Sequence, residues 1–281
     1  MIRKNELFTK HQTIIQPKKG WQMVDFKELK NYKDLFWFFI IRDIKVRYKQ
    51  TVLGGLWAII QPLLAMVVFT LFFGKLAKMP SDGIPYPVFN FSAMIAWTYF
   101  VNTVTISGSS LIGSSNLITK VYFPRLVVPL TPAFAGLLDF FIAFTILIGM
   151  MLFFHIYPTV MVIFLPLLIV IMMLTAVGVG TFFAALNVKY RDIRYVIPFL
   201  IQLGLFISPV VYPASMVPGK YQFIYSLNPM AGVIEGFRSI LFGTTSFPVQ
   251  MVVVSAFVSV ILFLSGIVYF KQMERYFADI I

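Results

Sequence analysis

Long apolar runs alternate with short polar segments along most of the chain. A helix needs about 20 apolar residues to cross the ~30 Å hydrocarbon core of a bilayer. The pattern therefore predicts an all-α integral membrane protein with six transmembrane helices. We place them at Leu53 to Phe73, Val88 to Leu111, Leu126 to Phe154, Pro158 to Leu186, Val196 to Tyr212 and Val249 to Phe270.

The composition supports this class of protein. Hydrophobic residues make up 59% of the 281 positions and charged residues only 12%, which is more apolar surface than a soluble domain of this length can bury. The sequence contains no Cys, and its two His residues, His11 and His155, are far apart. We therefore expect neither a disulfide framework nor a metal centre.

The basic charge of the chain, +12 at pH 7, is distributed as a topology signal. Twelve Lys and Arg residues precede the first predicted span, where the chain does not look like a cleaved signal peptide. With a cytoplasmic N-terminus, 19 of the 23 Lys and Arg residues lie in inner segments, and only Lys75, Lys78, Lys220 and Arg238 lie outside. This split predicts a multi-pass membrane protein with both termini inside, and no nucleic-acid partner.

The segment before the first span is aromatic and aliphatic, and its cations gather toward its end. From Lys33 to Gln50 it reads as an amphipathic helix along the cytoplasmic interface, where each cation gains about 1 kcal/mol from anionic lipids. A plain topogenic anchor is the alternative. We expect residues 1–50 to form a cytoplasmic N-terminal segment, 51–275 the transmembrane domain and 276–281 a cytoplasmic tail. The interfacial residues singled out are Trp37, Arg42, Lys45, Arg47 and Lys49.

A short cytoplasmic segment, GSSNLITKVYFPRLVVPL, joins the second and third predicted spans. It contains a helix-capable piece from Asn116 to Tyr122, with Ser114 and Ser115 as N-cap candidates and Pro124 as a stop. A short helix on such a turn forms a rigid knob that a partner can contact. A purely structural turn is the alternative.

The outer segment from residue 208 to 248 is apolar and aromatic, but prolines prevent one continuous helix. Irregular backbone at membrane depth must be buried in protein or line a wet cavity. We predict a re-entrant pair of half-helices that turns at Asn228 and Pro229, and an extracytoplasmic loop on the bilayer surface is the alternative. The prolines are Pro209, Pro213, Pro218 and Pro229.

Three acidic or basic side chains fall in apolar surroundings. Glu235 and Arg238 are three residues apart, so a helix would pair them on one face, and burial would make the pair a lock on the half-helix. Asp139 lies near the middle of the third span, where a charge costs about 3 kcal/mol. No other predicted span offers a cation at that depth, so we interpret Asp139 as a structural group, protonated or bonded to Thr, Ser or Asn donors.

The stretch GSSLIGSS, from Gly108 to Ser115, has the spacing of a phosphate-binding loop but carries Ser114 where the Lys belongs. It also lacks a preceding strand. We therefore expect this chain neither to bind ATP by such a motif nor to be an enzyme.

Aromatic residues form 17% of the chain and gather at span ends. An interfacial belt explains most of them, and an aromatic-lined path would also suit sugars, whose C–H faces stack on rings. The candidates for such a path are Trp57, Trp97, Tyr99, Phe100 and Tyr212.

Five motifs in order carry a family resemblance: DIKVRYKQTVLGGLWAIIQPL, NLITKVYFPR, YRDIRYVIPF, SPVVYP and NPMAGVIEGFR. Together they resemble the membrane permeases of type 2 ABC exporters for polysaccharides, most closely those of O-antigen lipopolysaccharide transporters. Permeases for wall teichoic acid and capsule are near relatives. The resemblance extends from about residue 30 to 275.

The resemblance implies a homodimer that pairs with two copies of a separate ATPase, which binds ATP and Mg, and that exports an undecaprenyl-linked polysaccharide. It also implies that the membrane is the bacterial cytoplasmic (inner) membrane. It implies that the interfacial helix contacts the ATPase, and that the re-entrant pair narrows a channel lined by the first and fifth spans. The gate residues are Pro213, Asn228, Pro229, Glu235 and Arg238. The coupling helix corresponds to Asn116, Leu117, Ile118, Thr119, Lys120, Val121, Tyr122, Phe123, Pro124 and Arg125.

Two other functions are alternatives. A type 2 ABC exporter of a drug or small lipid shares the architecture. A membrane glycosyl or acyl transferase would need paired acids or a His near the interface, and His155 has no obvious carboxylate companion in the sequence.

Overall fold

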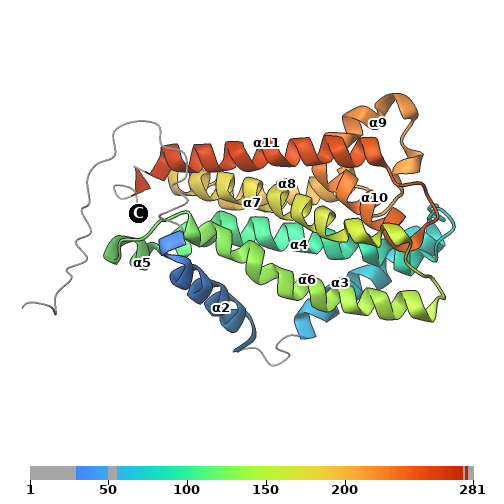
Figure 1. Cartoon of the computed structure of the whole chain (residues 1–281), viewed down its shortest axis with the longest axis horizontal. Helices are drawn as coiled ribbons and strands as arrows, with labels where there is room; N and C mark the ends of the chain where they lie inside the picture. The colour runs from blue at the N-terminus through green and yellow to red at the C-terminus, as the bar shows by residue number, and fades with distance from the viewer. Residues whose placement is uncertain (1–29, 50–55, 275, 278–281) are drawn as a thin grey trace, which may run out of the picture.

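The computed structural model describes residues 30–49, 56–274, 276 and 277, apart from the side chain of Ala58. Within these residues the chain is helical and contains no strand, and its long helices run side by side (Figure 1). The helices are α2 (Lys33–Lys49), α3 (Trp57–Phe69), α4 (Tyr86–Gly113), α5 (Ser115–Lys120), α6 (Val127–Phe153), α7 (Leu165–Lys189), α8 (Ile193–Ile207), α9 (Gly219–Ser226), α10 (Pro229–Phe242) and α11 (Val249–Glu274). Shorter π or 3-10 turns are Thr70–Leu76, Val160–Phe164 and Ala214–Met216.

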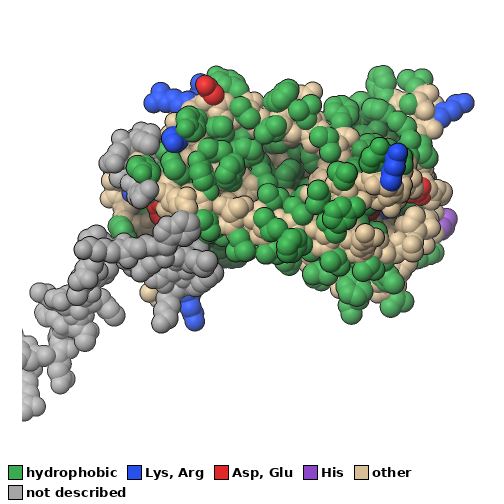
Figure 2. Space-filling view, turned by 90° about the horizontal axis from the view of Figure 1, so that it is seen from above, with side chains coloured by type: hydrophobic (Ala, Val, Ile, Leu, Met, Phe, Trp, Pro, Cys, Tyr) green, Lys and Arg blue, Asp and Glu red, His purple; other side chains and the backbone are tan. Residues whose placement is uncertain are grey.

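Four segments of the described chain are long and apolar enough to cross a membrane: Ile59–Leu76, Val127–Phe153, Val160–Lys189 and Val249–Glu274. They match the first, third, fourth and sixth predicted spans. The start of the first predicted span, Leu53, lies outside the described residues. Figure 2 shows a broad hydrophobic middle, with Lys and Arg side chains gathered toward the two ends of the molecule. A multi-pass membrane protein is the arrangement that fits this distribution.

The predicted second span is a helix, α4, but it is not apolar enough to be recognised as a span by itself. Helices α3, α6, α7, α8 and α10 all pack against it. Its polar residues Asn90, Thr103 and Ser107 are buried against these neighbours. Since protein surrounds much of α4, it can carry polar residues that a lipid-facing helix could not.

The predicted fifth span ends earlier than expected. Helix α8 stops at Ile207 and not at Tyr212, because Ser208 adopts an extended conformation (ψ 151°). The residue before a proline is biased away from helical dihedrals, and Pro209 follows Ser208 directly. With 15 residues, α8 is apolar but shorter than the other spans.

Helices α7 and α11 make the closest crossing of the bundle through two glycines. A Cβ at Gly266 would lie 2.2 Å from the carbonyl oxygen of Gly178, and one at Gly178 would lie 2.6 Å from the backbone of Leu262. Small residues let backbones approach in membrane proteins, where apolar burial alone does not drive helix association.

Substituting Gly266→Ala should therefore separate α7 from α11 and lower the free energy of unfolding by about 1–3 kcal/mol, as overpacking does in tight cores. Gly149→Ala in α6 is the matched control, because a Cβ there would meet nothing within 4 Å. Chemical unfolding in detergent micelles would compare the two variants. Equal stability of the two variants would contradict the proposed close crossing.

Candidate functional site: a helical hairpin and a hydrophobic cluster at opposite ends of the bundle

Helices α9 and α10 form a hairpin that turns where the sequence predicts, at Asn228 and Pro229. Pro229 occupies the first turn of α10, and the Asn228 side chain caps that helix by accepting a hydrogen bond from the Met230 amide at 3.1 Å. Gly243 ends α10 in a left-handed conformation (φ 66°), which a glycine adopts without strain.

The tip of this hairpin is anchored inside the bundle. All residues of α10 are buried, whereas most of α9 is exposed. The Ser255 hydroxyl of α11 donates to the carbonyl of Ser226 at 3.2 Å, and the Asn228 amide donates to the Ser208 hydroxyl at 2.9 Å. Helix α10 is thus packed inside the bundle, whereas α9 lies at its surface.

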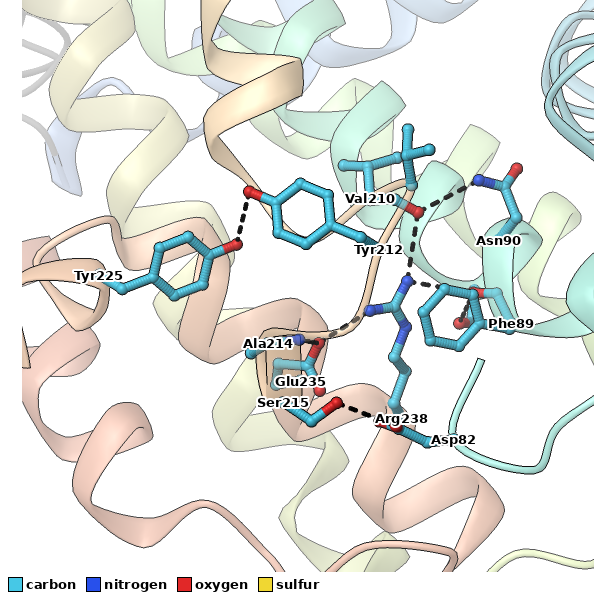
Figure 3. A network of polar contacts seen from close by, with 12 residues as sticks. Asp82, Phe89, Asn90, Val210, Tyr212, Ala214, Ser215, Tyr225, Glu235 and Arg238 are labelled. Atoms are coloured by element: carbon cyan, nitrogen blue, oxygen red, sulfur yellow. Dashed lines mark hydrogen bonds and ion pairs between the residues drawn. The ribbon is translucent and has the colours of Figure 1, made fainter. Parts of the chain in front are cut away.

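The predicted pair between Glu235 and Arg238 exists and is buried. Their side chains are 10% and 3% exposed, and the Arg238 guanidinium donates to Glu235 Oε1 at 2.8 Å (Figure 3). A second nitrogen of Arg238 donates to the carbonyls of Val210 at 3.2 Å and Phe89 at 3.4 Å, and the guanidinium lies 3.5 Å from the centre of the Phe89 ring. Glu235 also accepts from the Ala214 amide at 3.0 Å.

This pair therefore connects three elements: α10, α4 and the irregular segment after α8. Sequence reasoning identified the two charged residues but missed their partners on the other elements. Backbone carbonyls and a ring face compensate the buried guanidinium, as a charge in a dry interior requires.

Further side chains fix the segment that contains Ser208, Pro209, Val210, Val211, Tyr212 and Pro213. The Asn90 amide donates to the Val210 carbonyl at 3.1 Å, and the Tyr86 hydroxyl donates to the Val211 carbonyl at 2.8 Å (Figure 3 shows Asn90). Helix α4 thus supplies the hydrogen bonds that this irregular backbone cannot make with itself. The sequence offered no local signal for these contacts, because α4 lies more than a hundred residues away.

Two tyrosines connect the same segment with α9. The Tyr225 hydroxyl donates to the Tyr212 hydroxyl at 3.3 Å, and the Tyr212 hydroxyl donates to the carbonyl of Phe206 at 3.0 Å. Burial, and then the bond to Tyr212, hold the pKa of Tyr225 well above its usual value. Tyr225 therefore stays a neutral donor over the physiological pH range.

Asp139 has partners that the sequence interpretation did not foresee. Arg47 and Tyr48, both from α2, bond its two carboxylate oxygens. Thr131 of α6 also donates to Asp43 at 2.9 Å, and α2 lies obliquely along the N-terminal half of α6 (Figure 1). The expectation of Thr, Ser or Asn donors was wrong, because the counter-charge comes from a helix outside the predicted spans.

The opposite end of the bundle has its own hydrophobic cluster, here called the knob-end cluster. It joins α2, α4, α5, α6, α7 and α11 and contains Phe39, Leu111, Ile118, Phe123, Leu126, Val127, Val128, Ala184, Ala185, Val188, Phe270, Met273 and Phe277. The rings of Phe39 and Phe123 meet edge to face with centres 5.7 Å apart. The Arg125 guanidinium donates to the carbonyl of Glu274 at 2.8 Å. The segment that follows the predicted knob therefore packs against α2 and is hydrogen-bonded to the end of α11.

The knob is a shorter helix than predicted. Helix α5 covers Ser115–Lys120, and Val121 is extended, so neither Tyr122 nor Pro124 defines its end. Ser114 is the N-cap residue but makes no side-chain cap bond. The chain leaves the helix early because Phe123 turns inward and becomes 96% buried in the knob-end cluster.

The predicted site residues at this end differ in exposure. Asn116, Thr119, Lys120, Val121 and Tyr122 are exposed, Leu117 and Arg125 are half-buried, and Ile118, Phe123 and Pro124 are buried. On α2, Trp37, Lys45 and Lys49 are exposed, whereas Arg42 pairs with Asp43 at 2.8 Å. One surface of α5 and one of α2 thus remain open at the same end of the molecule.

The candidate path aromatics do not share one environment. Trp57 is 51% exposed and lines a cavity of about 40 Å³ together with Gln61, Asn102 and Asp139. Trp97 packs against Phe100 at a ring distance of 5.4 Å, and Tyr212 belongs to the hairpin network.

Tyr99 is only 3% exposed and donates to the carbonyl of Ala133 in α6 at 2.9 Å. It joins two helices and also lines the cavity that Trp57 borders.

Comparison with known proteins places this arrangement in a family. The family model for ABC-2 type transporters matches residues 34–242, which include α2, the knob and the hairpin. The chain belongs to the ABC-2 type transporter family. This membership confirms the resemblance that the five sequence motifs carry.

Similarity to individual proteins supports the same family assignment. The chain is 28% identical to the O-antigen export system permease protein RfbA of Klebsiella pneumoniae over 85% of its own length and 92% of the relative. It is 27% identical to the O-antigen export system permease protein RfbA of Myxococcus xanthus over 90% of its own length and 97% of the relative. The polysialic acid transport protein KpsM of Escherichia coli is 26% identical to the chain over 84% of the chain and 92% of KpsM. This ABC-2 permease is therefore homologous over nearly its whole length to polysaccharide export permeases.

Removing one partner of the buried ion pair in the hairpin should strongly destabilise the protein. Arg238→Met leaves Glu235 buried without its cation and should lower the free energy of unfolding by about 3–5 kcal/mol. Lys271→Met is a matched control, because Lys271 and Glu274 also pair at i,i+3 but are 27% and 22% exposed. The control should lose less than about 1 kcal/mol. Similar losses in thermal unfolding would show that the buried pair does not hold the hairpin.

The pair between Arg47 and Asp139 can be tested by a double-mutant cycle. Arg47→Gln and Asp139→Asn should each destabilise the protein, and the double variant should reveal a coupling of about 0.5–3 kcal/mol, as contacting residues do. Lys45→Gln, on an exposed position of the same helix, should not couple to Asp139→Asn. Strictly additive effects of Arg47→Gln and Asp139→Asn would argue against the contact.

Proposed function

We propose that this ABC-2 permease is the pore-forming subunit of an ATP-driven exporter that moves a lipid-linked polysaccharide, O-antigen or a closely similar glycan, across the bacterial cytoplasmic membrane. The observation that carries the proposal is a structural connection between the two ends of the helical bundle. The segment that follows the exposed knob α5 is hydrogen-bonded through Arg125 to the end of α11, and the outer part of α11 packs against the buried hairpin helix α10. Homology to O-antigen export permeases supplies the class of cargo.

The energy for export must come from a partner. The sequence between Gly108 and Ser115 lacks the Lys of a nucleotide-binding loop, and in the structure it forms the end of α4 and the start of α5 instead of a strand-to-helix loop. We infer that two copies of a separate ATPase, which bind ATP and Mg, contact α5 and the exposed face of α2. A push on α5 would then reach α11 through Arg125 and α2 through Phe123.

The passage would form between two copies of this chain. Helices α3 and α8 expose large apolar side chains, among them Leu64, Phe72, Phe199, Leu203 and Phe206. A second copy and lipid would cover these faces, with α3 and α8 beside the passage and the α9–α10 hairpin re-entering from the outer side to narrow it. In this topology α4 and α8 complete six spans, α2 lies at the cytoplasmic interface and both termini are cytoplasmic.

Capsular polysaccharide is the second candidate cargo, because KpsM matches over nearly the same share of the chain. A complementation experiment would distinguish O-antigen from capsular polysaccharide as the cargo. The permease and its ATPase would be expressed in one strain that lacks the O-antigen permease and in another that lacks the capsule permease, and surface glycan would be measured in both. Restoration in the first strain alone would favour O-antigen, and restoration in the second alone would favour capsule.

Disrupting the exposed surface of the knob should uncouple export. Replacing Asn116, Thr119 and Lys120 with Ala together with Val121→Asp should lower surface glycan at least about tenfold, since a polar substitution at a contact costs more than 1.4 kcal/mol. These residues are exposed, so the amount of folded protein should not change. Surface glycan, membrane-inserted protein and ATPase activity of the complex would be measured together.

Lys75→Ala, an exposed cation at the opposite end of α3, is the control and should export normally. Undiminished glycan in the knob variant would refute the coupling role of α5. ATP hydrolysis by the purified permease alone would refute the need for a partner.

A further inference from the structure

A second surface feature is separate from the knob and the hairpin. A groove of about 280 Å³ runs between α8 on one side and α4, α7 and α11 on the other. Its walls are almost entirely apolar and include Ile197, Leu200 and Ile201 of α8, Val179 and Phe183 of α7, and Leu262 of α11. The turn of the hairpin, at Asn228 and Pro229, closes its outer end.

Most polar groups in the walls already have a partner. The Thr175 hydroxyl donates to the carbonyl of Ile171 and meets the Ser259 hydroxyl, each at 2.8 Å. The Ser208 hydroxyl accepts from the Asn228 amide at 2.9 Å. The groove therefore presents mainly hydrocarbon to its occupant and offers few hydrogen-bonding groups to the hydroxyls of a sugar.

The length of the groove matches one leaflet of a bilayer. Its lining on α8 extends from Ile197 to Ile207, which is about 15 Å of helix at 1.5 Å per residue. Half of a ~30 Å hydrocarbon core is about 15 Å. An acyl chain of the inner leaflet fits this length, whereas a long polyprenyl chain would extend well beyond it.

Cations lie at the cytoplasmic end of the groove. Arg194 stands three residues before Ile197 and so shares its face of α8, and Lys189 ends α7 just beyond Phe183. Both are exposed, and their charged groups lie 4.8 Å and 5.1 Å from the rings of Tyr195 and Tyr190. Tyrosines are typical of the headgroup level, and each cation there attracts anionic lipid by about 1 kcal/mol.

We propose that this groove holds one acyl chain of an anionic glycerophospholipid of the cytoplasmic leaflet, with its phosphate at Arg194 and Lys189. The apolar groove and the cations at one end match the two parts of such a lipid. The site goes beyond polysaccharide export and does not depend on it, because it involves neither the glycan nor the ATPase.

Trp97 lines the groove and provides a probe for its occupant. The chain has four Trp residues, so replacing Trp21, Trp37 and Trp57 with Phe leaves Trp97 as the single fluorophore. The purified permease would be reconstituted in phosphatidylcholine vesicles that contain a small fraction of lipid with brominated acyl chains, which quench Trp on contact. Brominated phosphatidylglycerol should quench Trp97 at a several-fold lower fraction than brominated phosphatidylcholine.

Two variants test which residues of the groove bind the lipid headgroup and the acyl chain. Lys189→Gln with Arg194→Gln should abolish the preference for phosphatidylglycerol, and Val179→Phe should reduce quenching by both lipids, since it fills the groove. Lys75→Gln with Lys220→Gln removes the same charge from exposed positions at the outer end and should preserve the preference. Circular dichroism and thermal unfolding would confirm that each variant is folded.

Three results would overturn the proposal. Equal quenching by the two lipids, or a preference that survives loss of Lys189 and Arg194, would exclude an anionic headgroup at these cations. Displacement of phosphatidylglycerol by an equal fraction of polyprenyl phosphate would assign the groove to the carrier of the cargo. Absence of quenching by any lipid would show that protein, such as a second copy, covers the groove. Loss of the lipid preference would leave the proposed export of glycan unaffected, since surface glycan is measured in a separate experiment.

Discussion

The outer half of the molecule depends on one buried ion pair, Glu235 with Arg238. A charge in an apolar interior is tolerated only when its hydrogen-bonding groups are compensated. Arg238 obtains this compensation from Glu235, from two backbone carbonyls and from the Phe89 ring. Because those partners belong to three elements, the need to compensate one charge determines how α4, the segment after α8 and the hairpin fit together.

The half of the molecule that contains the knob is organised differently, by aromatic packing with a few charged contacts at its edges. Phe39 and Phe123 bring α2 against the segment after α5, and Arg125 holds the end of α11. Asp139 is the counterpart of Arg238 in this half, since its charge is met by Arg47 from α2. Contacts of this kind are more exposed and can rearrange at lower cost than a fully buried pair. The end of the bundle that would contact the proposed ATPase is thus the more adaptable one.

Much of the secondary structure was predictable because it follows from local rules. Apolar length predicted the spans that begin at Val127, Val160 and Val249, and Asn228 followed by Pro229 predicted the hairpin turn. The errors have physical causes that lie elsewhere in the chain. Helix α5 is shorter than predicted because Phe123 is buried by α2 and α11, and the partner of Asp139 was missed because Arg47 lies outside the spans.

The sequence by itself determined that the chain is a helical membrane protein, where its helices break and which charges need a partner. Those properties depend on apolar length, on proline and on the cost of burying charge, all of which are local to a segment. Only the tertiary structure decided which partners those charges have, that α4 is shielded by its neighbours and that α8 borders a groove. Such features arise from contacts between segments up to 149 residues apart, and the pattern within one segment carries no information about them.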